Sequence, residues 1–495
     1  MTINNRMLSA EEEKVKAQIE MAIAEKFDIP LSVIQHKPKL THKSVLNALL
    51  TELKEIDFRE KANLESSETL NRKHYVIISN EAILEAALNC QASLCMQDGF
   101  VYVYNGAYWK QMSKEILTDF LGRAALKLGV TQFEAKYYKF RDDLYRQFLS
   151  SAYLPKPEKQ GNEVLINLLN GTFVITPEVQ RLRDFHHNDF ITHQLNFAYD
   201  PTAEAPKFQK YLDRVLPDIK SQMIMAEFIG YVFVDQKTLK LEKALILFGN
   251  GANGKSVFFE IIIALLGPEN VSNFALQSLT NETGYSRAIL SDKLLNYGSE
   301  ISPKMDSTLF KQLVSGEPIE ARLPYKDPFL LTNYAKLIFN TNILPKEIEN
   351  NDAFYRRFTL IHFSQTIPEN ERDPLLAQSI IKEELAGVFN WVLLGLNRLL
   401  ENKGLTKSDV VDKSIEEYRQ QSDSVFMFLD EENWVKSHEK SKMLADIFTN
   451  YVEYCQACGY KACSRKTFAE RLRGLNYSVT RKSQGNMVGI AKNLA

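Results

Sequence analysis

The first part of the chain shows apolar residues at helical spacing. Residues 8–27 place apolar side chains every three or four positions after a Ser9/Glu12 capping box, and a second such stretch covers about 44–53. The polar run 61–73 that follows indicates a linker. We therefore expect a small helical module in residues 1–70.

The segment from residue 75 to 206 has a mixed pattern. Helical spacing near 80–95 and 113–127 alternates with short runs of aromatic and β-branched residues such as 100–104. Residues 164–175 predict two strands joined at Asn170-Gly171, a dipeptide that favours a tight hairpin. This pattern predicts an α+β domain.

Between residues 207 and 400 apolar strands alternate with helices. Helical spacing covers 208–234, and the expected buried strands are 244–248, 293–298, 336–339 and 358–363. Alternation of this kind is typical of a parallel sheet covered by helices. The predicted fold class of this region is therefore α/β.

The end of the chain, residues 405–495, predicts a helical linker and a further module. A helix is expected at 442–457, a second at 464–475 after the cap Ser464, and a hairpin at 477–490. Helix, helix and β-ribbon in this order resemble a winged-helix module, in which the second helix enters a DNA groove.

Positive charge gathers in that last module, although the whole chain has a formal net charge of −2. Between residues 461 and 492 only Glu470 opposes the basic residues Lys461, Arg465, Lys466, Arg471, Arg473, Arg481, Lys482 and Lys492. We expect Arg465 and Lys466 on the helix, and Arg481 and Lys482 on the hairpin, to contact duplex DNA. A basic face that only keeps the domain soluble is the alternative.

The loop between the first buried strand of the α/β region and the next helix has the pattern G-x-x-x-x-G-K-S. It consists of Gly249, Asn250, Gly251, Ala252, Asn253, Gly254, Lys255 and Ser256. In such loops backbone NH groups surround phosphates, the lysine reaches the β- and γ-phosphates, and the hydroxyl binds Mg²⁺. Strand, loop and helix follow in the required order, so we expect ATP and Mg²⁺ as cofactors, with Ser256 as a metal ligand.

Three further segments supply groups that an ATPase needs. The strand at 293–298 is followed by Glu300, a carboxylate that can activate water and support Mg²⁺ through a water molecule. The strand that begins at residue 336 leads to Asn342, which can contact the γ-phosphate. The pair Arg356 and Arg357 precedes the next strand, and a planar guanidinium can reach the γ-phosphate of a neighbouring subunit.

Composition narrows the class of protein. With 495 residues, 45% hydrophobic and 25% charged, the chain is expected to form two to four soluble domains. No apolar run approaches the roughly 18 residues that span a bilayer, and five cysteines fit a reducing compartment, so we expect a cytoplasmic protein without membrane contact. Cys455, Cys458 and Cys463 are compatible with part of a zinc site or with reduced thiols.

Five segments occur close together and in order: GNGANGKS, a strand ending in SEI, GEPIEARLPYKDPF, KLIFNTNILP and DAFYRRFTLIHF. This set resembles the core of superfamily 3 helicases. It resembles more closely the phage and plasmid primase family, which is typified by the C-terminal half of satellite-phage primases and by the poxvirus primase-helicase. FVYVYNGAYW and INLLNGTFVI look like the domain that precedes the helicase in that family, so the resemblance covers about residues 75–490.

The resemblance implies an AAA+-type P-loop NTPase core that assembles as a homo-oligomer, usually a hexameric ring. Such a ring uses ATP to pump a strand of DNA through its pore, in the 3′ to 5′ direction. Lys255 and Ser256 match the Walker A pair, Glu300 the Walker B acid and Asn342 sensor 1.

The same resemblance implies basic residues that act outside the subunit's own nucleotide site. Arg357 matches the arginine finger, with Arg356 as its substitute, and Lys311 lies where a trans-acting basic sensor can stand. The stretch 318–333 matches a hairpin that projects into the pore, with Lys326 near its tip and Arg322 beside it as expected phosphate contacts. A solvated turn lysine is the alternative for Lys326.

Two features depart from the family pattern. Many relatives have adjacent carboxylates where this chain has Ser299-Glu300, so Glu300 has to combine two roles or another carboxylate must help. Larger members of the family also carry a polymerising primase domain upstream, and residues 1–70 are too short for one. We therefore expect no primer synthesis.

These observations favour an ATP-dependent DNA helicase for replication initiation of a phage, plasmid or other mobile element, in a bacterial cytoplasm. The first alternative is an ATP-gated ring that binds and remodels an origin without processive unwinding and recruits a separate primase. A second alternative is a nucleotide-dependent scaffold. Strand displacement on forked DNA distinguishes the first function from the others.

Overall fold

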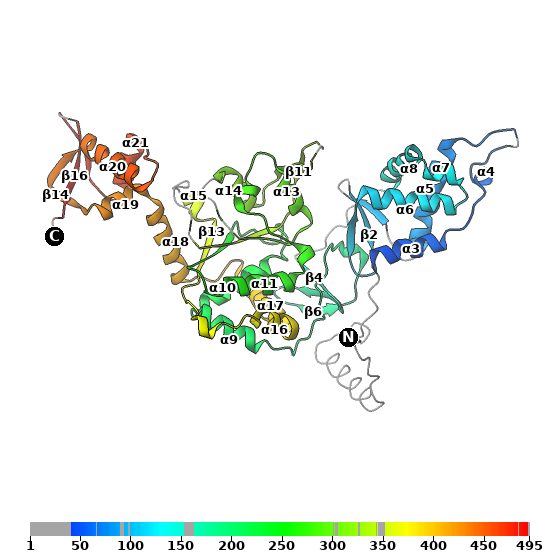
Figure 1. The fold of residues 1–495 in the computed structure, drawn as a ribbon, viewed down its shortest axis with the longest axis horizontal. Helices are drawn as coiled ribbons and strands as arrows, with labels where there is room; N and C mark the ends of the chain where they lie inside the picture. The colour runs from blue at the N-terminus through cyan, green and yellow to red at the C-terminus, as the bar shows by residue number, and fades with distance from the viewer. Residues whose placement is uncertain are drawn as a thin grey trace, which may run out of the picture. The chain divides into compact units, whose positions relative to one another are not determined.

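The computed structural model describes residues 41–65, 67–89, 94–97, 100–152, 163–299, 301, 305–324, 327–342, 344, 352–483 and 485–493. The expected helix 8–27 lies outside these residues. The chain divides into two compact units, Met1–Ala203 and Glu204–Ala495, which are coloured blue to teal and green to red in Figure 1.

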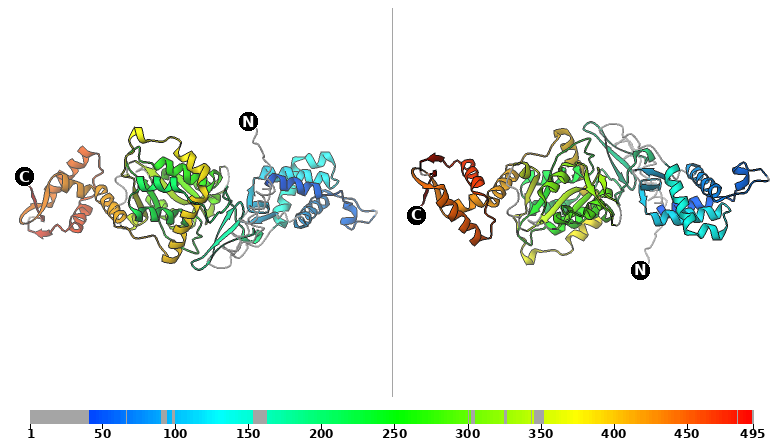
Figure 2. Two further views of the ribbon diagram at one scale, coloured as in Figure 1. Left: turned by 90° about the horizontal axis from the view of Figure 1, so that it is seen from below. Right: turned by 90° about the horizontal axis from the view of Figure 1, so that it is seen from above.

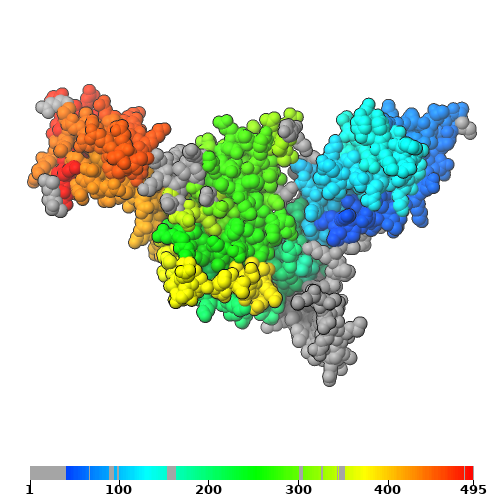
Figure 3. Space-filling model, viewed as in Figure 1, coloured from blue at the N-terminus to red at the C-terminus, as the bar shows by residue number. Residues whose placement is uncertain are grey.

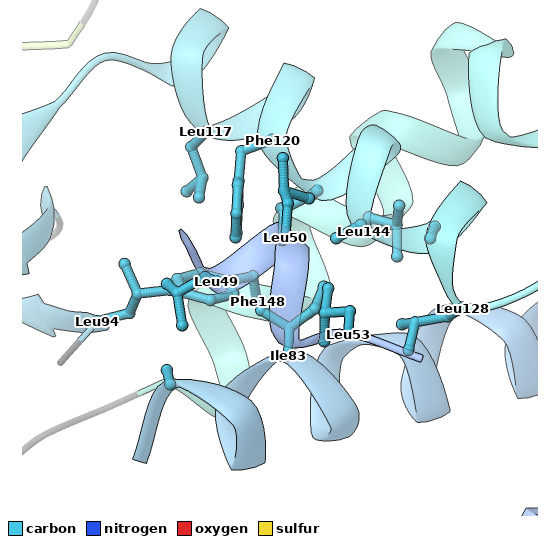
Figure 4. Close-up of a cluster of buried hydrophobic side chains, with 14 of the residues drawn as sticks. Leu49, Leu50, Leu53, Ile83, Leu94, Leu117, Phe120, Leu128, Leu144 and Phe148 are labelled. Atoms are coloured by element: carbon cyan, nitrogen blue, oxygen red, sulfur yellow. The ribbon is translucent and has the colours of Figure 1, made fainter. Parts of the chain in front are cut away.

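Helices form most of the first unit. They are α3 (His42–Glu52), α4 (Phe58–Lys61), α5 (Arg72–Asn89), α6 (Lys114–Lys127), α7 (Gln132–Lys136) and α8 (Tyr138–Ser151). Thr41 and Ser113 begin α3 and α6 as side-chain caps, because their hydroxyls accept from the backbone NH of Ser44 and Ile116. Figure 4 shows Leu49, Ile83 and Phe148 from three of these helices gathered in one apolar core.

Two antiparallel sheets complete the first unit. One contains β1 (Leu94–Gln97), β2 (Phe100–Tyr104) and β3 (Trp109–Met112), and the other contains β4 (Val164–Leu168), β5 (Gly171–Ile175) and β6 (Gln180–Arg183). The hairpin predicted around Asn170-Gly171 is confirmed, but its turn residues are Leu169 and Asn170, because Leu168 pairs with Gly171, which begins β5. The short 3-10 helix η1 (His187–Asp189) follows β6.

The second unit contains a five-stranded parallel sheet, which confirms the α/β prediction. Its strands are β7 (Ala244–Phe248), β8 (Val271–Ser272), β9 (Leu295–Gly298), β12 (Lys336–Thr341) and β13 (Phe358–His362), in the order β13-β7-β12-β9-β8. All neighbouring strands run parallel. These short apolar strands are buried, as expected for a sheet covered on both faces.

Helices flank this sheet in the views of Figure 2. The longer ones are α9 (Pro206–Val215), α10 (Ile219–Tyr231), α11 (Lys255–Leu266), α14 (Ser307–Ser315), α16 (Leu376–Glu383) and α17 (Leu385–Asn402). Phe310 of α14 stacks on Phe358 of β13, and Phe259 of α11 packs edge-on against Tyr297 of β9. The predicted helix 208–234 is interrupted, because α9 ends at Val215 and α10 begins after the cap Asp218.

Shorter elements connect the strands. They are η2 (Pro268–Asn270), α12 (Leu276–Leu279), α13 (Tyr285–Ile289), η3 (Leu290–Asp292), α15 (Asp352–Tyr355) and η4 (Glu369–Glu371). A two-stranded hairpin of β10 (Ile319–Ala321) and β11 (Phe329–Leu331) precedes β12. This hairpin lies within the predicted stretch 318–333.

The last part of the chain forms its own apolar core. Its elements are α18 (Asp409–Ser422), α19 (Ser424–Glu431), β14 (Trp434–Met443), α20 (Leu444–Cys458), α21 (Arg465–Gly474), β15 (Val479–Lys482) and β16 (Gly485–Lys492). The strands pair antiparallel in the order β14-β16-β15. The two helices and the final hairpin agree with the predicted order, whereas β14 was not predicted, and the helix expected from Lys442 begins at Leu444.

Candidate nucleotide site and basic surfaces

The glycine-rich loop lies where strand β7 meets helix α11. Gly249 lies so close to the backbone of Phe363 in the same chain that a Cβ at position 249 would be 2.3 Å from the carbonyl oxygen of Phe363. Gly254 has φ +89°, and a Cβ there would lie 2.8 Å from Val215 Cγ1. Both positions therefore require glycine, which gives the loop a backbone that other residues cannot form.

Lys255 is held inside this loop. Its ammonium donates to the carbonyl oxygen of Gly249 at 2.6 Å and to Asn253 Oδ1 at 3.1 Å. The Asn253 amide in turn donates to the carbonyl of Phe363 at 3.0 Å. The lysine is 7% exposed, and burial lowers its pKa. The loop is therefore preformed around its cation.

Two other segments fix the loop from outside. The hydroxyl of Tyr211 on α9 donates to the carbonyl of Gly254 at 2.8 Å, and Ile367 NH donates to the carbonyl of Ala252 at 2.8 Å. Ser256 lies exposed in the first turn of α11. The backbone NH groups at the N-terminus of a helix can bind an anion. The loop and the first turn of α11 are therefore suited to bind phosphate groups.

The carboxyl edge of the sheet, at which its strands end, places the other predicted groups. Thr341 of β12 pairs with Phe248 of β7, so Asn342 follows beside the start of the loop and is exposed. Ser299 follows β9 and is exposed, whereas Glu300 lies outside the described residues. Within β12, Asn340 Oδ1 accepts from the hydroxyl of Tyr297 at 3.1 Å.

His362 is a polar residue at this edge that the sequence analysis missed. Its ring stacks on Phe248, the last residue of β7, with centroids 4.5 Å apart. Burial lowers the pKa of His362; the charge of Glu417 opposes this shift, and the charge of Lys255 adds to it. A single histidine at the end of an apolar run forms no pattern along the sequence that distinguishes it from an ordinary strand residue.

The two predicted arginines differ in their surroundings. Arg357 is 9% exposed, and its guanidinium donates to Ser315 Oγ at 3.0 Å and to the carbonyl of Ala353. Arg356 is exposed, immediately before β13. A role of Arg357 in a neighbouring subunit stays a prediction, and the guanidinium is engaged within its own subunit here.

The amino edge of the sheet, at which its strands begin, carries a second cationic group that the sequence analysis did not find. We call it the lysine pocket, and it is formed around Lys240, Lys243 and Lys336 together with Tyr231 and Gln236. Lys243 immediately precedes β7 and Lys336 begins β12, so the sheet brings residues far apart in sequence to one edge. Arg356 and Arg357 precede β13 at the same edge.

The charges of this pocket are only partly balanced. Lys336 lies over the ring of Tyr231, 4.3 Å from its centroid, and burial lowers the lysine pKa to about 8 against the opposing influence of Asp235. Burial also lowers the pKa of Lys243, the charge of Asp412 opposes this shift, and the charge of Arg356 adds to it. Lys240 pairs with Glu242 at 3.1 Å. An additional negative group would therefore be stabilised at this edge.

The remaining candidate DNA contacts of the α/β region lie on α14 and the hairpin. Lys311 is half-buried on α14, and Arg322 is exposed after β10. Leu330 of β11 is 68% exposed, which is high for a strand residue. Lys326 lies outside the described residues, so its predicted position at the hairpin tip stays a prediction.

The predicted contacts in the last module are all exposed. Arg465 and Lys466 lie in the first turn of α21 after the cap Ser464, and Arg481 and Lys482 lie on β15. The sheet of this module, β14-β16-β15, carries further basic residues that were not predicted as DNA contacts. Lys442 and Lys492 lie over Trp434, and Lys436 lies over Tyr477.

The described parts of the chain contain neither a metal-ligand cluster nor a helix that could span a membrane. Three or more His, Cys, Asp or Glu side chains nowhere gather closely enough to hold a metal ion, and this includes Cys455, Cys458 and Cys463. Among the same residues, every helix is too short or too polar to span a bilayer.

Known proteins resemble this chain over much of its length. Residues 81–217 match a family model described as D5 N terminal like, and residues 247–357 match DUF5906, a family of unknown function. The chain is 24% identical over 343 residues to the protein named "Putative helicase L207/L206" of Acanthamoeba polyphaga mimivirus. The match covers 64% of this chain and 35% of that protein, so the chain spans about a third of its relative.

Solved structures of the NrS-1 C-terminal region are also similar. An A-form apo structure has a TM-score of 0.47 and 15% identity, covering 83% of this chain and 98% of that one. An apo structure of residues 305–718 has a TM-score of 0.46 and 14% identity, with 84% and 99% covered. Taken with the glycine loop and the parallel sheet, the family models and the viral relative support a likeness of this chain to primase-helicase proteins of the phage type.

Proposed function

We propose that this protein is an ATP-dependent DNA helicase that works as a ring in the replication of a mobile element. The observation that carries the proposal is the loop between β7 and α11, which is shaped by obligatory glycines around the buried Lys255. The strand order β13-β7-β12-β9-β8 supports an AAA+-type core of superfamily 3, because it sets the loop strand between β13 and β12.

Each group at the carboxyl edge has a proposed role in ATP hydrolysis. The loop NH groups and Lys255 bind the β- and γ-phosphates, and the exposed hydroxyl of Ser256 is available to Mg²⁺. Glu300 activates water and supports Mg²⁺ through a water molecule, and Asn342 contacts the γ-phosphate. Bound Mg²⁺ supplies neutralisation of the charge that develops on the phosphates.

The amino edge has a proposed role in the neighbouring subunit. Positive charge from the lysine pocket and Arg356 collects on the side of the sheet opposite the glycine loop. In a closed ring with head-to-tail contacts, each interface joins two different faces of the subunit. Arg356, being exposed, then suits the trans-acting role better than the buried Arg357, and Lys311 provides additional positive charge.

Two basic surfaces are proposed to bind DNA. The hairpin with Arg322 and Lys326 holds one strand in the pore through phosphate contacts. The last module, with exposed Arg465 and Arg481, binds duplex DNA in the manner of a winged helix. The order of α20, α21, β15 and β16 supports this assignment.

A second function is favoured by one specific observation. The sheet of the last module presents Lys436 beside Tyr477 and Lys442 beside Trp434, which enlarges the basic surface beyond the predicted contacts. Lys492 also lies over Trp434, but its ammonium pairs with Glu432 at 2.7 Å. An extensive duplex-binding surface suits a ring that recognises and remodels an origin without processive unwinding, and that recruits a separate primase.

Strand displacement on a fluorescent forked duplex tests these functions. We expect ATP- and Mg²⁺-dependent displacement by the wild-type chain and none by Lys255→Ala, whose fold is checked by circular dichroism. Native mass spectrometry with an ATP analogue and DNA tests ring formation. ATP hydrolysis stimulated by DNA without displacement would favour the origin-remodelling ring. Absence of ATP binding would contradict both functions.

A further inference from the structure

An aromatic surface in the first unit has no role in the proposed motor. Phe133 of α7 is 91% exposed and Tyr138 of α8 is 68% exposed, with Tyr137 between the two helices 40% exposed. We call these three residues the aromatic corner. Helices α7 and α8 are labelled in Figure 1 and belong to the cyan surface in Figure 3. Such exposure of large rings in close succession is unusual for a folded surface.

The backbone of the aromatic corner is firmly held. Arg141 Nε donates to the carbonyl oxygen of Ala135 at 2.9 Å, and Tyr137 NH donates to the carbonyl of Glu134 at 3.0 Å. Ala135 is 1% exposed and packs into the helical core. Gly122 of α6 lies against the same arginine, since a Cβ there would be 2.6 Å from Arg141 Nε. The rings are therefore displayed by a rigid turn.

Arg72 of α5 supports the corner from behind. Its Nε contacts Glu134 at 2.8 Å and its Nη1 lies 3.7 Å from Asp143, so it neutralises nearby acidic groups. Its guanidinium also lies over the ring of Tyr137, 5.2 Å from the centroid. Tyr137 thus has one face occupied, and it packs edge-on against Tyr138 at 5.1 Å.

Positive charge is interleaved with the exposed rings. Lys136 and Lys139 lie between the rings, and the acidic groups around them already have partners. Glu134 and Asp143 face Arg72, Asp142 pairs with Lys114 and Arg146, and Arg141 pairs with Asp119. Lys136 and Lys139 are exposed, and no ion pair joins them to another described residue. The surface thus combines free ammonium groups with open aromatic faces.

We propose that the aromatic corner binds single-stranded DNA, with bases stacked on Phe133 and Tyr138 and phosphates beside Lys136 and Lys139. Rings interleaved with cations suit a flexible anionic polymer whose bases have flat apolar faces. The charge argues against an apolar protein partner, whose interface core would be depleted of lysine. The choice of DNA rests on the proposed function, but the binding itself requires neither ATP nor movement.

Photocross-linking with a full-length chain and a poly-dT oligonucleotide containing 5-iodouracil tests the site directly. Without nucleotide present, we expect adducts in the peptides that contain Phe133 or Tyr138. The double variant Phe133→Ala/Tyr138→Ala should lose these adducts and weaken binding by about 10-fold or more, since it removes both rings on which bases stack.

Matched variants separate stacking from general apolar contact. Phe133→Leu keeps an apolar side chain but removes the ring, and we expect it to lose the cross-link at this position. Val179→Ala truncates a 45% exposed apolar residue elsewhere in the same unit and should bind as the wild type does. Lys136→Glu/Lys139→Glu should weaken binding and reduce its dependence on salt.

Three outcomes would overturn the proposal. These are adducts found only elsewhere in the chain, unchanged affinity in the double alanine variant, or a change of native mass without a change of DNA affinity. The last result would make the corner an interface between copies. Failure of strand displacement with the cross-links retained would count against the proposed helicase and leave the aromatic corner intact.

Discussion

The two edges of the parallel sheet in the second unit differ in how many cationic side chains they hold and in which groups surround them. At the carboxyl edge one buried ammonium, Lys255, is satisfied by the carbonyl of Gly249 and the carboxamide of Asn253. At the amino edge the lysine pocket and Arg356 gather four cations, which the three carboxylates of Asp235, Glu242 and Asp412 oppose. The cation of the first edge has its hydrogen-bond partners within the same loop, whereas the cations of the second edge outnumber the carboxylates that oppose them.

The largest expected effect tests whether Arg356 at the amino edge acts at the nucleotide site of the adjacent subunit. Arg356→Ala should lower the turnover number for ATP by about 10³-fold, because a trans-acting arginine stabilises charge in the transition state. Its stability should be unchanged, since the side chain is exposed. Arg357→Ala should instead destabilise the protein by about 1–3 kcal/mol through loss of buried hydrogen bonds. Steady-state hydrolysis and urea unfolding measure the two effects.

Mixed rings provide the control for this comparison. Lys255→Ala subunits lack their own site but still offer Arg356, and Arg356→Ala subunits have the converse defect. Mixing the two inactive variants should therefore restore part of the ATP hydrolysis at interfaces that combine the intact halves. If no mixture recovers activity, Arg356 does not act in trans.

The next effect tests the electrostatic cost of the lysine pocket. Burial lowers the pKa of Lys336 from 10.5 to about 8, so between these values the unfolded chain binds more protons. Wild-type stability should therefore rise with pH across this window. Lys336→Met should be more stable than wild type by about 2 kcal/mol at pH 7, and the difference should fade toward pH 10.5.

Urea unfolding at several pH values between 7 and 10.5 measures this difference. Lys240→Met is the matched control, since Lys240 is exposed and paired with Glu242 and should show little pH-dependent change. Equal stability of Lys336→Met and wild type at all pH values would contradict the claim that burial of the Lys336 ammonium destabilises the fold.

A smaller effect tests how the carboxyl edge holds its cation. Asn253→Ala should raise the dissociation constant for ATP by about 10-fold, because Lys255 loses one partner and the loop loses its bond to Phe363. Asn250→Ala is the matched control, with an exposed side chain in the same loop. Titration with a fluorescent ATP analogue measures the dissociation constants of the two variants. Equal affinity of Asn253→Ala and Asn250→Ala would show that the Asn253 side chain is not required for ATP binding.

The smallest effect concerns the support of the loop by α9. Tyr211→Phe removes the hydroxyl bond to the carbonyl of Gly254 and keeps the ring, so we expect a loss of about 1 kcal/mol in stability. Tyr285→Phe, at a residue 42% exposed, should be neutral. Thermal unfolding of the two variants is the measurement. A loss as large for Tyr285→Phe would point to a general effect of the substitution.

The contrast between the edges also explains what the sequence could predict. The loop from Gly249 to Ser256 is contiguous, so its residue pattern and the apolar strand before it were sufficient to locate it. The lysine pocket joins Lys243 to Lys336, and only the pairing of β7 with β12 makes them neighbours. Patterns along a single sequence carry no information about such pairing.

Strand β14 illustrates a second limit. Residues 434–443 read WVKSHEKSKM, and almost all of these side chains are exposed, so the strand lacks the apolar alternation that identifies a half-buried strand. Its hydrogen bonds to β16 stabilise it instead. The basic residues Lys436 and Lys442 were overlooked for the same reason. Glu300 and Lys326 lie outside the described residues and stay predictions.

The preformed loop has a consequence for the heat of nucleotide binding. Burial makes Lys255 a weaker base before ATP arrives, whereas a triphosphate beside the ammonium would restore its affinity for a proton. Binding at alkaline pH should therefore take up protons from the medium. The enthalpy that a calorimeter records would then vary with the ionisation heat of the buffer, and the slope of that variation would count the protons that Lys255 acquires.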